Sequence, residues 1–150
     1  MTADVTSSPH TEAISLTNTK SNVIYERFYS KFSDWERAGI REAFAQASDG
    51  LQLGVAEEAE QCSRYRGGVV AVRAESDLVL YGLGTGEYDE LSLAEALRAV
   101  TAALRALFKR APTETLLLDN YGQLCLALDE MIQEGILESV EAEDVRRHIA

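Results

Sequence analysis

The hydrophobic pattern of the first part of the chain has a period of two residues. Residues 12–18 alternate between polar and apolar side chains, as in a half-buried strand. Val23–Tyr29 is rich in β-branched and aromatic residues, which favour strands. The polar run between them, residues 18–22, has the composition of a turn. These segments therefore predict a β-hairpin.

A helical pattern follows the hairpin. Ser33 or Asp34 can cap the first turn of this helix, and Ser48–Gly50 can stop it. Its apolar positions are Trp35, Gly39, Ala43 and Ala47, with Ile40 and Phe44 beside them. The acidic segment Leu51–Glu60 that comes next has no pattern that predicts an element.

Three further strands are expected in the middle of the chain. Residues 61–66 give a weak signal and Val69–Val72 a strong one. Leu78–Leu83 is almost continuously apolar, as expected for a central strand that is covered on both faces. The polar residues 74–77 supply the turn between the last two strands.

The period then changes to that of a helix. Leucine and valine recur at helical spacing through about Lys109, at Leu93, Leu97, Val100, Leu104 and Leu107. Pro112 ends this helix, and Thr113 can cap the next one. The predicted buried side of that second helix comprises Leu116, Leu117, Tyr121, Leu124, Leu128 and Met131, and Gly122 is expected to kink or divide it. Residues 141–149 can form a short terminal helix.

The predicted order is β-β-α-β-β-β-α-α with a short terminal helix. Consecutive hairpins favour an antiparallel sheet, so the expected fold is α+β, with a five-stranded antiparallel sheet flanked by helices. We expect a flexible tail over residues 1–11 and one domain over residues 12–150, because 150 residues allow a single substantial core.

Composition narrows the classes of function. With 46% apolar residues the chain is not expected to be disordered, and a net charge of −11 argues against binding nucleic acid or anionic lipid directly. Cys62 and Cys125 lie far apart and are expected to be reduced thiols. The polar N-terminus does not resemble a signal peptide, and no apolar run is long enough to span a membrane. We therefore expect a soluble, intracellular protein.

Candidate chemistry is sparse. The segment Gly82–Gly86 is expected to form a glycine-rich turn between a strand and a helix. Such a turn could expose backbone amides to a phosphate, and a small nucleotide-binding enzyme remains a remote alternative. Its spacing fits neither nucleotide motif, however, and the acidic residues that follow would repel phosphate. The adjacent carboxylates at 57–58, 89–90 and 129–130 are expected on the surface, and His10 and His148 have no neighbours at ligand spacing. We expect no catalytic residues, metal or cofactor.

Six residues are candidates for a partner interface. Arg64, Tyr65, Arg66 and Arg73 cluster in the strand region, and arginine and tyrosine are enriched at interfaces. If residues 61–66 form an edge strand, the arginines also protect that edge from aggregation. Trp35 and Phe44 allow two interpretations, core first and interface second.

An ordered set of segments resembles the small chains of vesicle-coat complexes. These segments are residues 22–30, Gly67–Arg73, Asp77–Tyr81, Glu87–Leu93, Leu116–Asn120 and the run Asp129–Ser139. The profile is similar to the longin-type fold of adaptor and coatomer small chains, and more narrowly to the zeta subunit of coatomer. The order Ile136–Ser139 and the polar N-terminal tail favour zeta over the sigma-type chains of clathrin adaptors, whereas Glu134–Gly135 departs from the two glycines usual in the zeta family.

The resemblance implies a non-catalytic subunit of the COPI coat. It implies a heterodimer with a large gamma-type coatomer subunit, further coat subunits, and recruitment to the membrane by an Arf-family GTPase. The chain would then be cytoplasmic and peripheral on Golgi and COPI vesicle membranes, acting in Golgi–ER and intra-Golgi transport. A sigma-type chain, the alternative, would add recognition of dileucine cargo signals.

Overall fold

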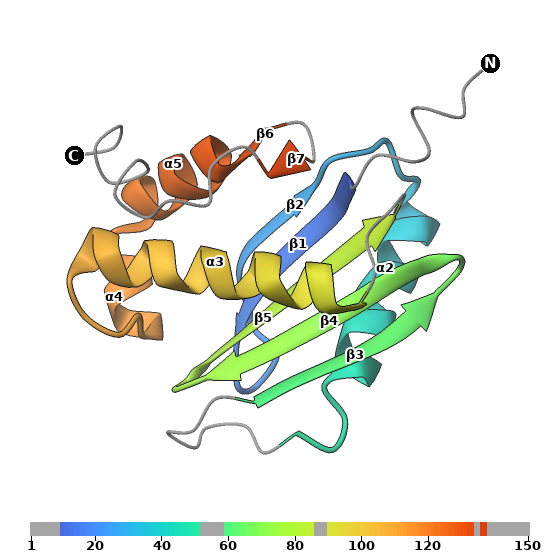
Figure 1. Cartoon of the computed structure of the whole chain (residues 1–150), viewed down its shortest axis with the longest axis horizontal. Helices are drawn as coiled ribbons and strands as arrows, with labels where there is room; N and C mark the ends of the chain where they lie inside the picture. The colour runs from blue at the N-terminus through green and yellow to red at the C-terminus, as the bar shows by residue number, and fades with distance from the viewer. Residues whose placement is uncertain (1–9, 52–58, 86–89, 134–135, 138–150) are drawn as a thin grey trace.

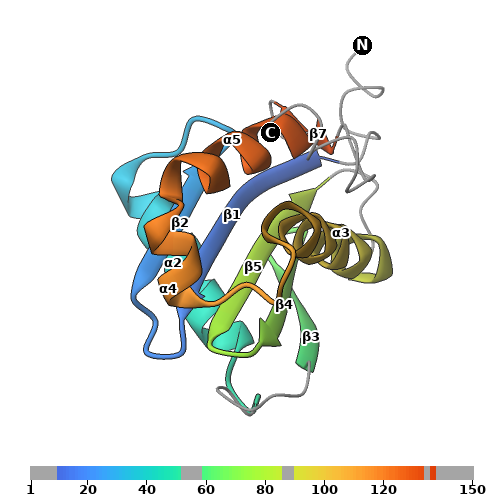
Figure 2. The ribbon, with the colours of Figure 1, turned by 90° about the vertical axis from the view of Figure 1, so that its left-hand side faces the viewer.

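A five-stranded antiparallel sheet lies between helices on both of its faces (Figures 1 and 2). The computed structural model describes residues 10–51, 59–85, 90–133 and 136–137. The elements of the sheet layer and its helices are β1 (His10–Asn18), β2 (Val23–Phe28), α2 (Asp34–Ala47), β3 (Ala59–Tyr65), β4 (Gly68–Glu75), β5 (Leu78–Thr85), α3 (Glu90–Phe108), α4 (Glu114–Asp119) and α5 (Tyr121–Met131). The strand order is β2-β1-β5-β4-β3, and every neighbouring pair is antiparallel. The predicted α+β fold is confirmed.

The two faces of the sheet build two separate cores. On one face, α3, α4 and α5 cover side chains such as Ile14, Val69 and Leu80. On the other face, α2 alone covers a smaller cluster that includes Val70, Tyr81 and Leu83. Every residue of β4 is buried, and so is every residue of β5 except Thr85. The continuous apolar run of β5 therefore predicted a central strand correctly.

The predicted helix starts are also confirmed. Ser33 caps α2 in a reciprocal arrangement: its hydroxyl accepts from the Glu36 amide, and the Glu36 carboxylate accepts from the Ser33 amide. Thr113 caps α4 by accepting from the Leu116 amide. The break between α4 and α5 lies at Asn120, not at the predicted Gly122. The Asn120 side-chain amide donates to the Leu116 carbonyl and so ends the first helix locally.

Two predicted burial patterns are wrong in part. In α2 the side chains that face the sheet are Ile40, Phe44 and Ala47, spaced by four and three residues, while Trp35 is exposed on the flank of the helix. In α5 the predicted position Tyr121 is exposed, because the break at Asn120 turns the first residue of α5 outward.

The ends of the domain differ in detail from expectation. His10 and Thr11, predicted to belong to the tail, are the first residues of β1. Beyond α5 the chain forms a short hairpin, β6 (Ile132–Gln133) and β7 (Ile136–Leu137), that the sequence did not predict. The predicted terminal helix over 141–149, the tail residues 1–9, and most of the Leu51–Glu60 connection lie outside the described residues.

Candidate interaction surface

Three of the six predicted interface residues meet at the β3–β4 turn, on the α2 face of the sheet. We call Trp35, Tyr65 and Arg66 the Trp35 patch. The Arg66 guanidinium carbon lies 5.2 Å from the centroid of the Trp35 ring and 5.6 Å from that of the Tyr65 ring. Trp35 is 71% exposed, the largest fraction among the exposed large hydrophobic side chains. An exposed tryptophan stacked with an arginine is typical of an anchor for a protein partner.

Local backbone chemistry builds the patch. Arg66 and Gly67 form the two-residue turn between β3 and β4, and both have positive φ, 48° and 80°. Turns of this kind match the twist of the flanking strands and favour glycine at the second position. Gly39 lets α2 approach β3, because a Cβ at that position would lie only 2.6 Å from the Tyr65 Oη. The aromatic ring of Tyr65 is thereby held against the helix.

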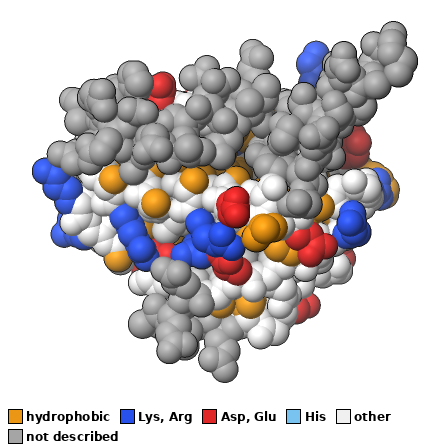
Figure 3. Space-filling view, viewed as in Figure 1, with side chains coloured by type: hydrophobic (Ala, Val, Ile, Leu, Met, Phe, Trp, Pro, Cys, Tyr) orange, Lys and Arg blue, Asp and Glu red, His pale blue; other side chains and the backbone are white. Residues whose placement is uncertain are grey.

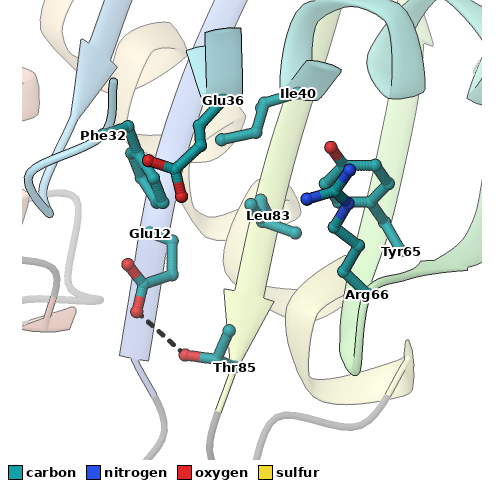
Figure 4. A pocket seen from close by; sticks show the side chains of 8 residues that line it. All are labelled: Glu12, Phe32, Glu36, Ile40, Tyr65, Arg66, Leu83 and Thr85. Atoms are coloured by element: carbon teal, nitrogen blue, oxygen red, sulfur yellow. Dashed lines mark hydrogen bonds between the residues drawn. The ribbon is translucent and has the colours of Figure 1, made fainter. Parts of the chain in front are cut away.

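Two hollows flank the patch. The first has a volume of about 320 Å³, and it is lined by Glu12, Phe32, Glu36, Ile40, Tyr65, Arg66, Leu83 and Thr85 (Figure 4). Figure 4 shows Leu83 between the Glu12 and Glu36 carboxylates on one side and Arg66 on the other. Glu12 is held in place because it accepts from the Thr85 and Ser30 hydroxyls. The second hollow, of about 310 Å³, lies along the outer side of α2 and includes Trp35 in its lining.

The remaining predicted interface residues are not part of this patch. Phe44 is buried in the core and stacks on Tyr81 with 5.2 Å between ring centroids, so only the first of its two interpretations holds. Arg73 is buried on the opposite face of the sheet, under α3. Arg64 is exposed on β3 and lies on that same opposite face, because side chains alternate along a strand. The sequence placed these arginines together, but the pleat of the sheet separates them.

Arg73 is the centre of an ion network between the sheet and α3. Its guanidinium pairs with Glu60 and Glu75, and Arg98 and Arg105 of α3 pair with the same two carboxylates. Figure 3 shows basic and acidic side chains close together on the surface of the α3 side. The hydrogen bonds from Arg98, followed by the charge of Arg73, lower the pKa of Glu60. The network therefore fastens the edge strand β3 to α3.

A second arginine–aromatic cluster, which the sequence did not predict, lies at the start of α2. The Arg37 and Arg41 guanidinium carbons lie 5.0 and 5.5 Å from the Phe28 ring centroid. Arg41 also binds the Glu26 carboxylate with two hydrogen bonds, of 2.9 and 2.7 Å. The spacing of Arg37 and Arg41, one helical turn apart, is the signal that could have revealed it. This cluster ties β2 to α2 beside the first hollow.

Most of the glycine-rich segment considered for nucleotide binding lies in a strand, and Gly86 lies outside the described residues. The segment expected to form a turn at Gly82–Gly86 is the end of strand β5 as far as Thr85. Gly82 pairs with Ile14 on one side and Ala71 on the other, so its backbone is part of the sheet. In the described part of the chain, no group of three or more His, Cys, Asp or Glu side chains could hold a metal ion. Both cysteines are free thiols and half-buried, as predicted.

Comparison with known proteins finds similarity both in sequence and in fold. The chain is 24% identical over 134 residues to the TSET complex member tstD of Dictyostelium discoideum, covering 89% of this chain and 87% of that protein. It superposes with a TM-score of 0.55 on a chain of a homology model of the full-length AP-3 complex in a stretched open conformation. That match has 14% identity and covers 93% of this chain and 90% of the other. The fold is therefore longin-like, as expected. No family model matches the chain, and none of the described helices is long and apolar enough to cross a membrane.

Proposed function

We propose that this chain is a non-catalytic small subunit of a heteromeric, adaptor-type vesicle-coat complex. The observation that carries the proposal is the similarity to a TSET complex member along nearly the whole length of both chains. The longin-like fold shared with a chain of the AP-3 complex supports it independently of sequence. The exposed Trp35 patch, with its stacked arginine, is compatible with a role in assembly.

The partner that we propose is a large, solenoid-like chain that packs over the α2 face. The Trp35 patch supplies an aromatic anchor and an arginine, the residue types that dominate binding energy at interfaces. The two hollows beside the patch can accommodate side chains of a partner. Permanent interfaces of this kind commonly bury more than about 2,000 Å². The isolated chain should therefore gain stability when the large chain binds.

Within this class we propose two more specific alternatives, a zeta-type subunit of COPI and a sigma-type subunit of a clathrin adaptor. The order Ile136–Ser139 favours zeta, and the similarity to a TSET member and to AP-3 gives the sigma-type alternative comparable support. Binding of dileucine peptides by the assembled complex would favour sigma. A gamma-type coatomer partner, an Arf-family GTPase and a location at Golgi membranes belong to the zeta proposal.

Affinity purification of the tagged chain from its own cells, with mass spectrometry of the co-purifying chains, tests the proposal. We expect a large adaptin-like chain in stoichiometric amount. The pair should then be reconstituted by co-expression and compared with the variants Trp35→Ala and Arg66→Ala. Both should weaken the pair by more than about 1 kcal/mol, because truncating an anchor residue leaves its contacts unfilled.

Leu91→Ala is the matched control for these variants. Leu91 is exposed on α3, on the other face of the sheet, so its removal should leave the pair intact. A chain that purifies alone, or only with chains unrelated to coat complexes, would contradict the proposed function. Equal binding by all three variants would leave the subunit role standing and exclude the α2 face as the interface.

A further inference from the structure

The edge strand β3 is the least covered strand of the sheet. None of its seven residues is buried, whereas the other edge strand, β2, buries Ile24 and Tyr25 beneath α4 and α5. Within the described part of the chain, the backbone of β3 makes hydrogen bonds only with β4. An exposed strand edge with unpaired backbone groups is a template for pairing with another strand. The question is which strand fits it.

We propose that the free chain forms a two-fold dimer in which β3 pairs with β3 of a second copy, antiparallel and centred on Cys62. This inference is independent of the proposed coat function. Cys62 is the midpoint of β3, Ala59–Tyr65, so this register pairs the whole strand. Two sheets of five strands would then join into one continuous sheet across the dimer axis.

Charge selects this register. Antiparallel pairing about Cys62 places Glu60 of each copy opposite Arg64 of the other, on the same face of the sheet. Opposite charges in directly facing positions stabilise a strand pair, and like charges destabilise it. A shift of two residues toward the C-terminal end, centred on Arg64, would instead place the two Arg64 side chains opposite each other. In the single chain Arg64 makes no ion pair with a described residue.

Glu60 can accept this additional neighbour. Its carboxylate already binds Arg98 through two hydrogen bonds, of 2.8 and 3.0 Å, and pairs with Arg73. Because its side chain remains 27% exposed, Arg64 of the second copy can approach it from the open edge. The ion network of one copy would thus extend to the arginine of the other.

The helices leave room for the pairing. Both α3 and α2 pack mainly on β4, one strand in from this edge, with smaller contacts to β5 and β3 on either side of it. In the dimer the two β4 strands are separated by three strand spacings, about 14 Å. Packed helices lie about 8–10 Å apart, so the two copies of each helix would stand side by side without overlap. The added contact is a single strand pair, and we therefore expect a weak dimer that depends on concentration.

Cys62 reports the register directly. At the centre of the dimer the two Cys62 residues face each other with Cα atoms about 4.5–5.5 Å apart, which is within the range of a disulfide. The purified full chain should be oxidised mildly at about pH 9, where thiolate forms although burial raises the pKa of Cys62. We expect a covalent dimer that Cys125→Ser retains and Cys62→Ser loses. A dimer that needs Cys125 would overturn the register.

Ser63→Cys in the Cys62→Ser, Cys125→Ser background is the control for random collision. Ser63 is exposed, but in the proposed register it lies diagonally from its own copy, about 7–8 Å away. It should therefore cross-link much less than Cys62. Equal or faster cross-linking through residue 63 would overturn the proposal, because collision would then explain both products.

Arg64→Glu tests the charge pairing without oxidation. Sedimentation of the reduced chain over a range of concentrations should show a monomer–dimer equilibrium. Arg64→Glu creates two like-charge pairs and should weaken this equilibrium about tenfold, whereas Leu126→Ala, at an exposed position on α5 away from β3, should leave it unchanged. A chain that stays monomeric at every concentration, or an Arg64→Glu variant that dimerises normally, would overturn the inference. Either result would leave the proposed coat function untouched.

Discussion

The two faces of the sheet differ in how completely they are covered. Three helices close the α3 face over a core that holds eight of the eleven largest fully buried side chains among the described residues, Leu97 and Leu128 included. The α2 face has one helix, with hollows on both sides of it. Trp35, the most exposed aromatic side chain among the described residues, lies on this second face. The difference teaches that one face is closed by packing, and that the other leaves exposed aromatic and hollowed surface, which we propose as the surface for a partner.

The largest expected effect is the loss of packing on the α3 face. Leu97→Ala should lower the free energy of unfolding by about 2–5 kcal/mol, because it leaves a cavity between α3 and β5. Leu91→Ala, on the same helix but 63% exposed, should change it by less than about 0.5 kcal/mol. Urea unfolding of both variants gives these values. Equal losses of unfolding free energy in the two variants would contradict the proposed difference between buried and exposed positions of α3.

The ion network should contribute less than the apolar core. Arg73→Met should lower the free energy of unfolding by about 1–3 kcal/mol, since it removes a buried charge that holds two carboxylates. The loss is limited because Glu60 keeps Arg98 and Glu75 keeps Arg105. Arg98→Met, at an exposed position, should cost less. Urea unfolding in low and high salt checks both, and a larger loss in Arg98→Met would contradict this order.

The same network should make stability depend on acid pH. The folded pKa of Glu60 is lowered, so its ionised form stabilises the fold above the unfolded pKa of about 4.3. This contribution is lost as the pH falls through the lowered folded pKa. The difference in unfolding free energy between wild type and Glu60→Gln should therefore be constant above about pH 5 and shrink below it. A difference that persists at about pH 2 would show that the charge of Glu60 is not its source.

The smallest effect on stability is expected at the Trp35 patch. Trp35→Ala should change the free energy of unfolding by less than about 0.5 kcal/mol, because the side chain is mostly exposed. Thermal unfolding of the isolated chain measures this. A loss as large as that of Leu97→Ala would show that Trp35 supports the fold, and the distinction between the two faces would fail.

The sequence predicted the elements better than it predicted the surface. Hydrophobic period and capping chemistry placed the strands and helices, because both act within a few neighbouring residues. The Trp35 patch depends on a helix and a turn that are far apart in the chain, and only the packing of Gly39 against Tyr65 brings them together. The exposure of Trp35 could not be predicted from the hydrophobic pattern of its helix. An apolar residue at the border of the apolar stripe can face either the core or the solvent.

Glycine caused the clearest error. The glycine-rich composition predicted that the turn had begun by Gly84, yet the Gly84 backbone pairs with Thr11 on one side and Val69 on the other. Composition favours a turn where no neighbours compete for the backbone. The strands β1 and β4 supply those neighbours, and their positions are decided by the whole sheet rather than by the segment.

The strand order also sets when this chain can fold. β1 pairs with its neighbour β2 through a short turn, but its other neighbour is β5, with Ile14 opposite Gly82. Closing so long a loop costs entropy before any central pairing is gained. During synthesis the N-terminal hairpin must therefore wait, with its apolar face uncovered, until β5 and then α3 have left the ribosome. The central position of β5 therefore predicts an interval during synthesis in which the uncovered hairpin is exposed to aggregation.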